Sequence, residues 1–142
     1  MTIVEFMKRY KAAWETSDEH ALVALFAADG SYHNTPFAEQ RGHAAIAQYW
    51  QRTKLQSDIH LDCEILSQHA TGGIAHWHVT YQVTSEELFR IWAASTGTNA
   101  LARQPGEALP RLALDGIAVV EFDDAGLCAQ LRLWWHSVVA GA

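Results

Sequence analysis

The chain has 142 residues, 49% of them hydrophobic, which suits one domain with a sizeable core and leaves little room for a second. Its formal net charge is −6 at pH 7 and its lysines and arginines form no basic stripe, which argues against nucleic acid as a partner. No apolar run approaches the roughly 20 residues of a membrane span, and the N-terminus lacks the apolar segment of a signal peptide, so we expect a cytoplasmic protein with no membrane partner.

Two helices are predicted at the start of the chain. Thr2 and Glu5 form a T-x-x-E capping box, and apolar side chains follow at helical spacing as far as Trp14. The capping pattern recurs at Thr16, ahead of a shorter apolar stripe. Gly30 fits the position just past the end of this second helix, where a left-handed backbone is cheap only for glycine.

The segment Asp29–Phe37, DGSYHNTPF, follows the second helix and is polar at its centre. Pro36 excludes a long central strand there, so a short extended segment is predicted. A third helix is predicted near His43–Thr53, because larger side chains recur on one face, and Gly42 marks its start.

From residue 59 onward the apolar period changes to two, which predicts strands. Residues 59–65 and 73–83 alternate and are joined around a TGG turn. Residues 111–122 and 127–139 alternate in the same way, on either side of a turn at Asp123–Gly126. The four segments therefore predict an antiparallel meander.

Residues 84–110 show only one or two helical turns, with Ser85 as the cap, followed by an irregular segment. A long irregular segment inside a compact domain is either functional or disordered, and we expect it to form a flap.

The order of the predicted elements is typical of one fold class. Helices come early and antiparallel strands come late, which predicts an α+β fold with helices packed on one face of the sheet. Cys63 and Cys128 lie in alternating apolar segments without CxxC spacing, so we expect both to be buried, reduced thiols.

Several segments together resemble the NTF2-like superfamily, in its SnoaL-like branch: RYKAAWETSD, LFAADGSYHNTPF, RGHAAIAQYW and DGIAVVEFDDAGLCAQLRLWWH. The resemblance covers nearly the whole chain apart from residues 84–110 and implies one SnoaL-like domain over residues 1–142. It implies an NTF2-like cone, in which a curved antiparallel sheet wraps around three N-terminal helices and leaves a pocket at the wide end. The superfamily includes ketosteroid isomerase, scytalone dehydratase, limonene epoxide hydrolase and polyketide cyclases, and also proteins with no assigned reaction, so fold alone does not decide the chemistry.

Asp115 and His136 are the principal catalytic candidates. Asp115 interrupts an apolar strand, where a carboxylate is costly unless it is hydrogen-bonded or faces a wet cavity. Pairing Phe122 with Leu127 puts Asp115 on the face that carries His136, whereas a one-residue shift reverses this. On a shared face the pair would hold a proton-transfer base near neutral pKa. The alternatives are a carboxylate paired locally beside Gly116 and a structural histidine.

The resemblance suggests groups that would polarise a ligand oxygen. Ketosteroid isomerase holds an oxyanion with a tyrosine and a protonated aspartate, roles for which Tyr32 and Asp115 are the candidates here. His33, beside Tyr32, is the alternative polarising group. Limonene epoxide hydrolase uses an Asp–Arg–Asp arrangement, but Ala113 stands where that pattern has arginine.

His76 and His78 form an H-x-H pair whose imidazoles point to the same side of a strand, as a metal site requires. No third ligand with suitable spacing accompanies them in the sequence, and the superfamily seldom uses metal. We therefore expect an exposed polar face or a dimer surface, with no metal and no other cofactor.

The chain has six tryptophans, more than a core of this size needs. We expect some of the aromatic residues to line a cavity for a flat or apolar ligand: Trp14, Trp50 and Trp134, with Phe37 at the rim. Trp92 and Phe89, in the predicted flap, are either lid residues or buried against a partner subunit.

The predicted function is binding of a small hydrophobic or aromatic molecule in a conical pocket. It would be coupled to cofactor-free acid–base catalysis of the isomerase, dehydratase or cyclase type, performed by Asp115 and His136 with Tyr32 or His33. The alternative is a non-catalytic ligand-binding or dimerisation module. We expect a homodimer formed through the outer face of the sheet.

Overall fold

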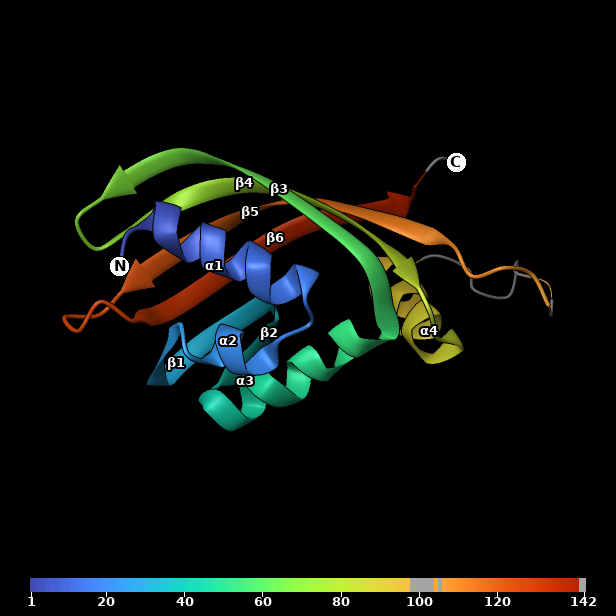
Figure 1. The fold of residues 1–142 in the computed structure, drawn as a ribbon, viewed down its shortest axis with the longest axis horizontal. Helices are drawn as coiled ribbons and strands as arrows, with labels where there is room; N and C mark the ends of the chain where they lie inside the picture. The colour runs from blue at the N-terminus through green and yellow to red at the C-terminus, as the bar shows by residue number, and fades with distance from the viewer. Residues whose placement is uncertain (98–103, 105, 141–142) are drawn as a thin grey trace.

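The computed structural model describes residues 1–97, 104 and 106–140. One six-stranded sheet, with strands in the order β2–β1–β6–β5–β4–β3, arches over the helices (Figure 1). Neighbouring strands are antiparallel, except that β1 and β6 are parallel. The elements in chain order are α1 (Ile3–Glu15), α2 (Glu19–Val23), β1 (Phe26–Thr35), β2 (Ala38–Arg41), α3 (His43–Trp50), a 3₁₀ helix η1 (Gln51–Leu55), β3 (Gln56–His69), β4 (Gly72–Val83), α4 (Glu86–Thr96), β5 (Arg111–Phe122) and β6 (Cys128–Val139).

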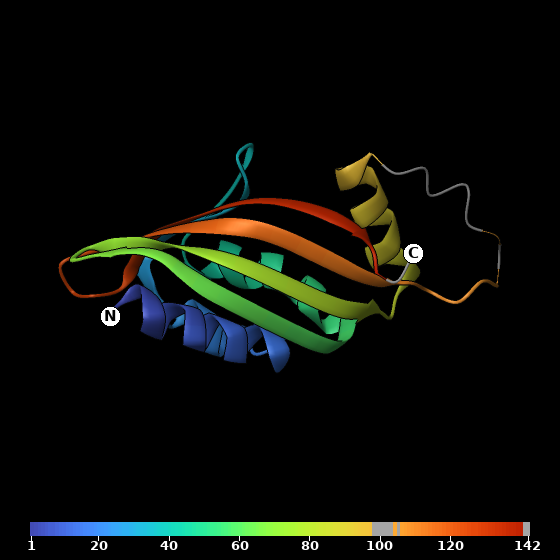
Figure 2. The ribbon, with the colours of Figure 1, turned by 90° about the horizontal axis from the view of Figure 1, so that it is seen from above.

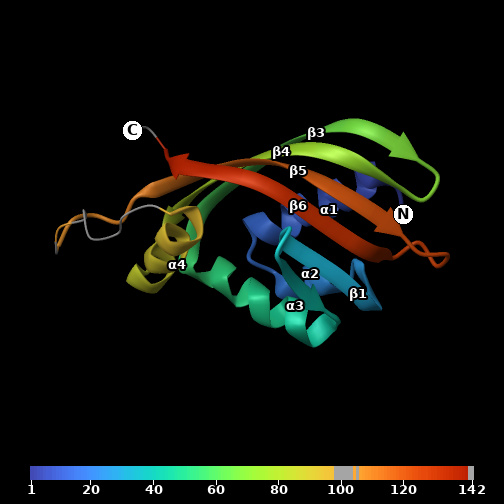
Figure 3. The ribbon, with the colours of Figure 1, turned by 180° about the vertical axis from the view of Figure 1, so that it is seen from behind.

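The curved sheet has a concave face, which holds the helices, and a convex face. Helices α1, α2 and α3 lie within the arch, and α4 lies at one end of the sheet (Figures 1 and 3). Seen from above, the convex surface of β3–β6 carries no helix over it (Figure 2). The predicted α+β fold, with three N-terminal helices packed on a curved sheet, is confirmed, and α4 is a fourth helix where the sequence suggested one or two turns.

Helix α1 forms because its start is capped and one of its faces is apolar. The Thr2 hydroxyl accepts a hydrogen bond from the Glu5 amide, and the Glu5 carboxylate accepts one from the Thr2 amide, as the capping box predicts. The apolar face is fully buried against the sheet and runs from Ile3 to Trp14. This face supplies the aromatic side chains that reach the candidate site.

The second helix is shorter than predicted, and Gly30 does not end it. Asp18, not Thr16, caps α2, because its carboxylate accepts a hydrogen bond from the Ala21 amide at 3.0 Å. The chain enters β1 at Phe26, so Gly30 lies inside a strand. A Cβ at Gly30 would lie 2.8 Å from the carbonyl oxygen of Cys128, so the close approach of β6 is what requires glycine here.

The register between β5 and β6 contains a bulge that the sequence did not indicate. Phe122 pairs with Cys128, but Glu121 pairs with Gln130. Asp115 therefore faces His136 directly across the strand pair. The predicted pairing was wrong by two residues along most of the hairpin, and an even error keeps side chains on the same face. The two residues share a face, as expected.

Two further expectations have different outcomes. Cys128 is buried, but Cys63 is exposed, because it lies in β3, the edge strand of the sheet. Residues 98–103 and 105, which belong to the predicted flap, lie outside the described residues. Within the part of the chain that the structure describes, no helix is long and apolar enough to cross a membrane.

Candidate functional site

A cavity of about 110 Å³ lies between the concave face of the sheet and the helices. Its wall is mainly aromatic and takes side chains from nearly every element of the fold. The lining residues are Trp14, Tyr32, Asn34, Thr35, Tyr49, Trp50, Arg52, Thr53, Gln56, Trp77, Tyr81, Leu88, Ile91, Trp92, Ser95, Leu114, Leu133 and Trp135. Such a wall suits a small, largely apolar ligand held by a few polar groups.

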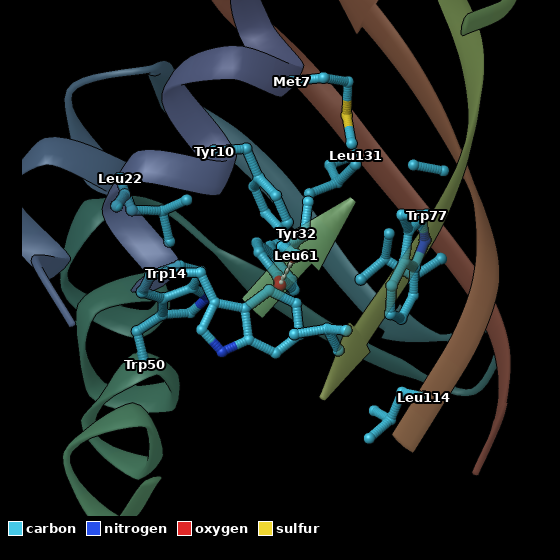
Figure 4. Close-up of a cluster of buried hydrophobic side chains, with 14 of the residues drawn as sticks. Met7, Tyr10, Trp14, Leu22, Tyr32, Trp50, Leu61, Trp77, Leu114 and Leu131 are labelled. Carbon is cyan, nitrogen blue, oxygen red and sulfur yellow. Dashed lines mark hydrogen bonds between the residues drawn. The ribbon is translucent and has the colours of Figure 1, made fainter. Parts of the chain in front are cut away.

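Tryptophan side chains from three elements meet around this cavity. The rings of Trp14 and Trp50 lie 6.0 Å apart between centroids, and Trp77, on β4, lies 6.0 Å from Trp14 (Figure 4). The Trp14 indole N–H donates to Gln56 Oε1 at 2.8 Å, which fixes the orientation of that ring. The structure therefore places Trp14 and Trp50 on the cavity, where the sequence predicted them.

Tyrosine hydroxyls form part of the polar lining of the wall. The hydroxyls of Tyr10 and Tyr32 are hydrogen-bonded at 2.8 Å (Figure 4), and the Tyr32 ring lies 5.4 Å from that of Tyr49. Burial raises the pKa of Tyr32 well above that of a free phenol. Tyr32 therefore stays protonated at neutral pH and can donate a hydrogen bond to a ligand oxygen, but it cannot act as a base.

Helix α4 closes one end of the cavity. Trp92 lines it, and its indole N–H donates to the Ser137 hydroxyl at 2.8 Å, which ties the helix to β6. Phe89 is buried with its ring 5.8 Å from that of Trp92, and it lies behind the wall and not in it. Trp92 thus occupies the position that the sequence suggested for a residue covering the pocket.

Asp115 and His136 lie on the convex face, so the expectation that they share a hollow between sheet and helices is wrong. Their neighbours Leu114 and Trp135 line the cavity, and alternation sends the two polar side chains to the other side. The Asp115 side chain is 54% exposed. A carboxylate at this position needs no wet cavity, because bulk water solvates it.

The partners of Asp115 are His76 and His78, which the sequence analysis considered separately. Asp115 Oδ1 lies 2.8 Å from His76 Nε2, and Oδ2 lies 3.0 Å from His78 Nδ1. The hydrogen bond from His76, followed by that from His78, holds the pKa of Asp115 below its usual range. Asp115 is therefore ionised at neutral pH.

These contacts also bear on the H-x-H pair as a metal site. Asp115 is a third potential ligand, from a neighbouring strand, that spacing along the sequence did not indicate. Among the described residues, however, no group of three His, Cys, Asp or Glu side chains is arranged to hold a metal ion.

Two aromatic residues predicted for the cavity lie outside it. Trp134 is 41% exposed on the convex face, and Phe37, in the β1–β2 turn, is 99% exposed. Together with Asp115 and His136 they border an open groove on the outer side of β6. Trp135, the neighbour of Trp134, lines both the cavity and this groove. The prediction for Trp134 was wrong because adjacent residues of a strand point to opposite faces, and that for Phe37 was wrong because the turn that carries it projects into solvent.

His33 lines neither the cavity nor the outer groove. Its Nε2 is buried, has no hydrogen-bond partner among the described residues and lies 4.0 Å from Glu39 Oε1. Of the two groups proposed to polarise a ligand oxygen, only Tyr32 reaches the cavity.

Several lining residues were not predicted from the sequence, and Arg52 is the most distinctive of them. Arg52 lies three residues after Tyr49, so both belong to the same face of the predicted third helix. Its guanidinium carbon lies 4.0 Å from the centroid of the Tyr49 ring, and its Nε donates to the Tyr49 carbonyl oxygen at 3.1 Å. This i,i+3 spacing was a usable signal.

The family model for the SnoaL-like domain matches residues 7–131. No curated protein matches the chain by sequence. One similar solved structure is that of the epoxide hydrolase/cyclase-like enzyme SalBIII, which has a role in pyran ring formation in the polyether salinomycin. The TM-score is 0.69 and the identity 13%, over 96% of this chain and 94% of that one. A Δ5-3-ketosteroid isomerase from Mycobacterium sp. is similar with a TM-score of 0.68 and 17% identity, over 94% of this chain and 92% of that one. At such identities the likeness supports a common fold.

Proposed function

The chain belongs to the SnoaL-like domain family, and from that premise we propose that it binds a small hydrophobic or aromatic molecule in the cavity between sheet and helices. The observation that carries the proposal is the aromatic wall, in which indoles and phenols from helices and strands surround one volume. The two similar structures belong to proteins named for reactions on small molecules, which agrees with such a role.

The polar groups of the cavity favour binding over proton transfer. Among the described residues that line it, none is an aspartate, glutamate, histidine, lysine or cysteine. Proton abstraction needs a base within hydrogen-bonding reach of the substrate. Tyr32 supplies a donor that would polarise a ligand oxygen. Catalysis of the isomerase, dehydratase or cyclase type would therefore rely on Tyr32 and not on an Asp–His pair.

Indole N–H signals in a ¹⁵N-correlated NMR spectrum test the site directly. A neutral aromatic probe such as indole or 1-naphthol is expected to shift the signals of Trp14, Trp50 and Trp77, which line the cavity. The signal of Trp134, on the convex face, is the internal control and should stay in place. Shifts confined to Trp134 would move the site to the outer groove and defeat the proposal.

A substitution at the edge of the cavity gives the matching functional prediction. Ser95 lines the cavity but is itself exposed, so Ser95→Phe adds a ring there without disturbing the core. We expect the affinity for the neutral probe to fall by about tenfold or more, because the added ring would occupy space that the ligand needs and packing both would strain the cavity. The controls are Asp115→Asn and His136→Ala, which should leave the affinity within about twofold because both side chains lie across the sheet from the cavity. Loss of binding in these controls instead would restore the Asp–His hypothesis.

We further propose that a second copy of the chain covers the convex face. This face exposes Trp134 and Val138 among groups of both signs. Asp115 lies beside two histidines, and Glu121 Oε1 lies 3.8 Å from Arg132 Nη2. A two-fold interface brings the same patch against itself, and a patch that carries both signs is self-complementary.

The oligomeric state tests this second proposal. Wild-type protein is expected to sediment as a dimer, and Trp134→Glu as a monomer, because a carboxylate would be buried at the centre of the contact. Val4→Glu provides the control, since Val4 is an exposed apolar residue on α1, away from the convex face. A wild-type monomer at high protein concentration, or a dimer that persists in Trp134→Glu, would rule the convex face out.

A further inference from the structure

The described lining of the cavity carries a positive charge and no negative charge. Arg52 is the only formally charged side chain among the described residues that line it. No described carboxylate lies within ion-pairing distance of the guanidinium, whereas its neighbour Lys54 is paired with Glu19 at 3.1 Å. An arginine retains its charge under all ordinary conditions, so the cavity wall carries a positive charge that no described carboxylate compensates.

The guanidinium is held in place by contacts that leave its outer donors available. Its Nε–H donates to the Tyr49 carbonyl oxygen, and its plane lies over the Tyr49 ring. No described residue accepts a hydrogen bond from its two terminal nitrogens. Those nitrogens form the fork that binds a carboxylate through two parallel hydrogen bonds.

The tyrosines of the wall lie within the field of this charge. Burial raises the pKa of Tyr32, Tyr49 and Tyr81, and in each case the positive charge of Arg52 partly offsets the rise. Arg52 thus acts on the same space that these three phenols border, and a ligand in that space would be close to it.

A second unmatched polar group lies in the wall. The indole N–H groups of Trp92 and Trp135 each donate to a protein acceptor, Ser137 Oγ and the Asn34 carbonyl oxygen. Trp77 is only 2% exposed, and its Nε1 has no partner among the described residues. A buried donor without an acceptor costs about 1–3 kcal/mol.

The cavity volume limits the size of the ligand. An apolar protein cavity of about 150 Å³ is known to hold one benzene molecule. At about 110 Å³, this cavity suits a single ring, and a larger ligand would have to extend through the opening. The indoles of Trp14, Trp50 and Trp77, which line the cavity, lie close together on its wall (Figure 4).

We propose that the cavity selects a small aromatic anion, a single ring carrying a carboxylate, with the carboxylate on the Arg52 guanidinium and the ring against the tryptophans of the wall. The inference deepens the proposed binding function and rests on it. It makes the net charge of the ligand, and not only its apolar surface, a determinant of affinity.

Benzoate and benzamide are the probes, because they have nearly the same shape and differ in charge. Calorimetric titration of the whole chain at neutral pH and low salt is expected to show benzoate binding about tenfold or more tightly than benzamide. Arg52→Gln should abolish the preference, and Arg52→Lys should restore part of it, because lysine keeps the charge but not the fork. Lys54→Gln makes the same change of net charge two residues away and should keep the preference.

The outcomes separate this inference from the function on which it depends. Equal affinities for benzoate and benzamide in the wild type, or a preference that survives Arg52→Gln, would overturn the aromatic anion while leaving a neutral-ligand cavity intact. A preference lost equally in Lys54→Gln would show general surface electrostatics and would also overturn it. Failure of benzoate to bind, while 1-naphthol shifts the cavity indoles, would refute the anion alone.

Discussion

Replacing Trp50 by alanine is expected to lower the free energy of unfolding by about 3–5 kcal/mol, the usual cost of removing a large buried aromatic side chain. Trp50 is 2% exposed, and its ring lies 5.8 Å from that of Tyr10 and 6.0 Å from that of Trp14. Removing the indole would enlarge a cavity that already exists. The Tyr10 and Trp14 rings would then lose their contact with Trp50, and no side chain would replace it. Chemical denaturation followed by circular dichroism measures the change.

Phe37→Ala is the matched comparison for Trp50→Ala. The sequence predicted the same role for both residues, as aromatic groups at a ligand pocket, but Phe37 is 99% exposed. Its removal should change the free energy of unfolding by less than about 0.5 kcal/mol. Similar losses in the two variants would mean that Phe37 is covered in solution, and that the turn between β1 and β2 lies differently from the arrangement described above.

Sequence patterns predicted an element most accurately where its signals were local to that element. The capping box at Thr2 and the apolar face up to Trp14 specify α1 completely, since both are local signals. The four strands predicted from residue 59 onward follow from alternation alone, although β3 extends beyond the predicted residues 59–65 at both ends. The start of β1 was missed because Phe26 continues the helical spacing of α2, and only its pairing with β6 makes it a strand residue.

The candidate site was harder to predict, because alternation separates two faces but does not say which one is concave. Asp115 and His136 were correctly placed on one face, and that face proved to be the solvent side. Trp134 and Trp135 are adjacent and chemically identical, so only the curvature of the sheet assigns one to the cavity. The more apolar neighbours of Trp135, Leu131 and Leu133, were the available signal.

Gly116→Ala is expected to destabilise the fold by about 3 kcal/mol, although it adds a single methyl group. Gly116 lies in β5 on the concave side, and a Cβ there would overlap the carbonyl oxygen of Trp134 and lie 2.8 Å from Cζ2 of Trp77. The first atom is backbone of β6, which pairs with β5 at this point, so it cannot move without disturbing pairing in the sheet.

The position explains why a glycine interrupts an otherwise apolar strand. The Trp77 indole can pack closely against β5 because Gly116 has no side chain. The absence of a Cβ at Gly116 therefore positions Trp77 as one wall of the cavity. Gly116→Ala should therefore weaken binding of an aromatic probe as well as the fold, with the indole signal of Trp77 shifted in the free protein. Ala113→Val, on the outer face of the same strand, should leave the stability unchanged or slightly raised, because β-branched residues favour strands. Gly116→Ala within about 0.5 kcal/mol of the wild type would mean that Trp77 can turn aside freely, and that the cavity wall it forms is not fixed.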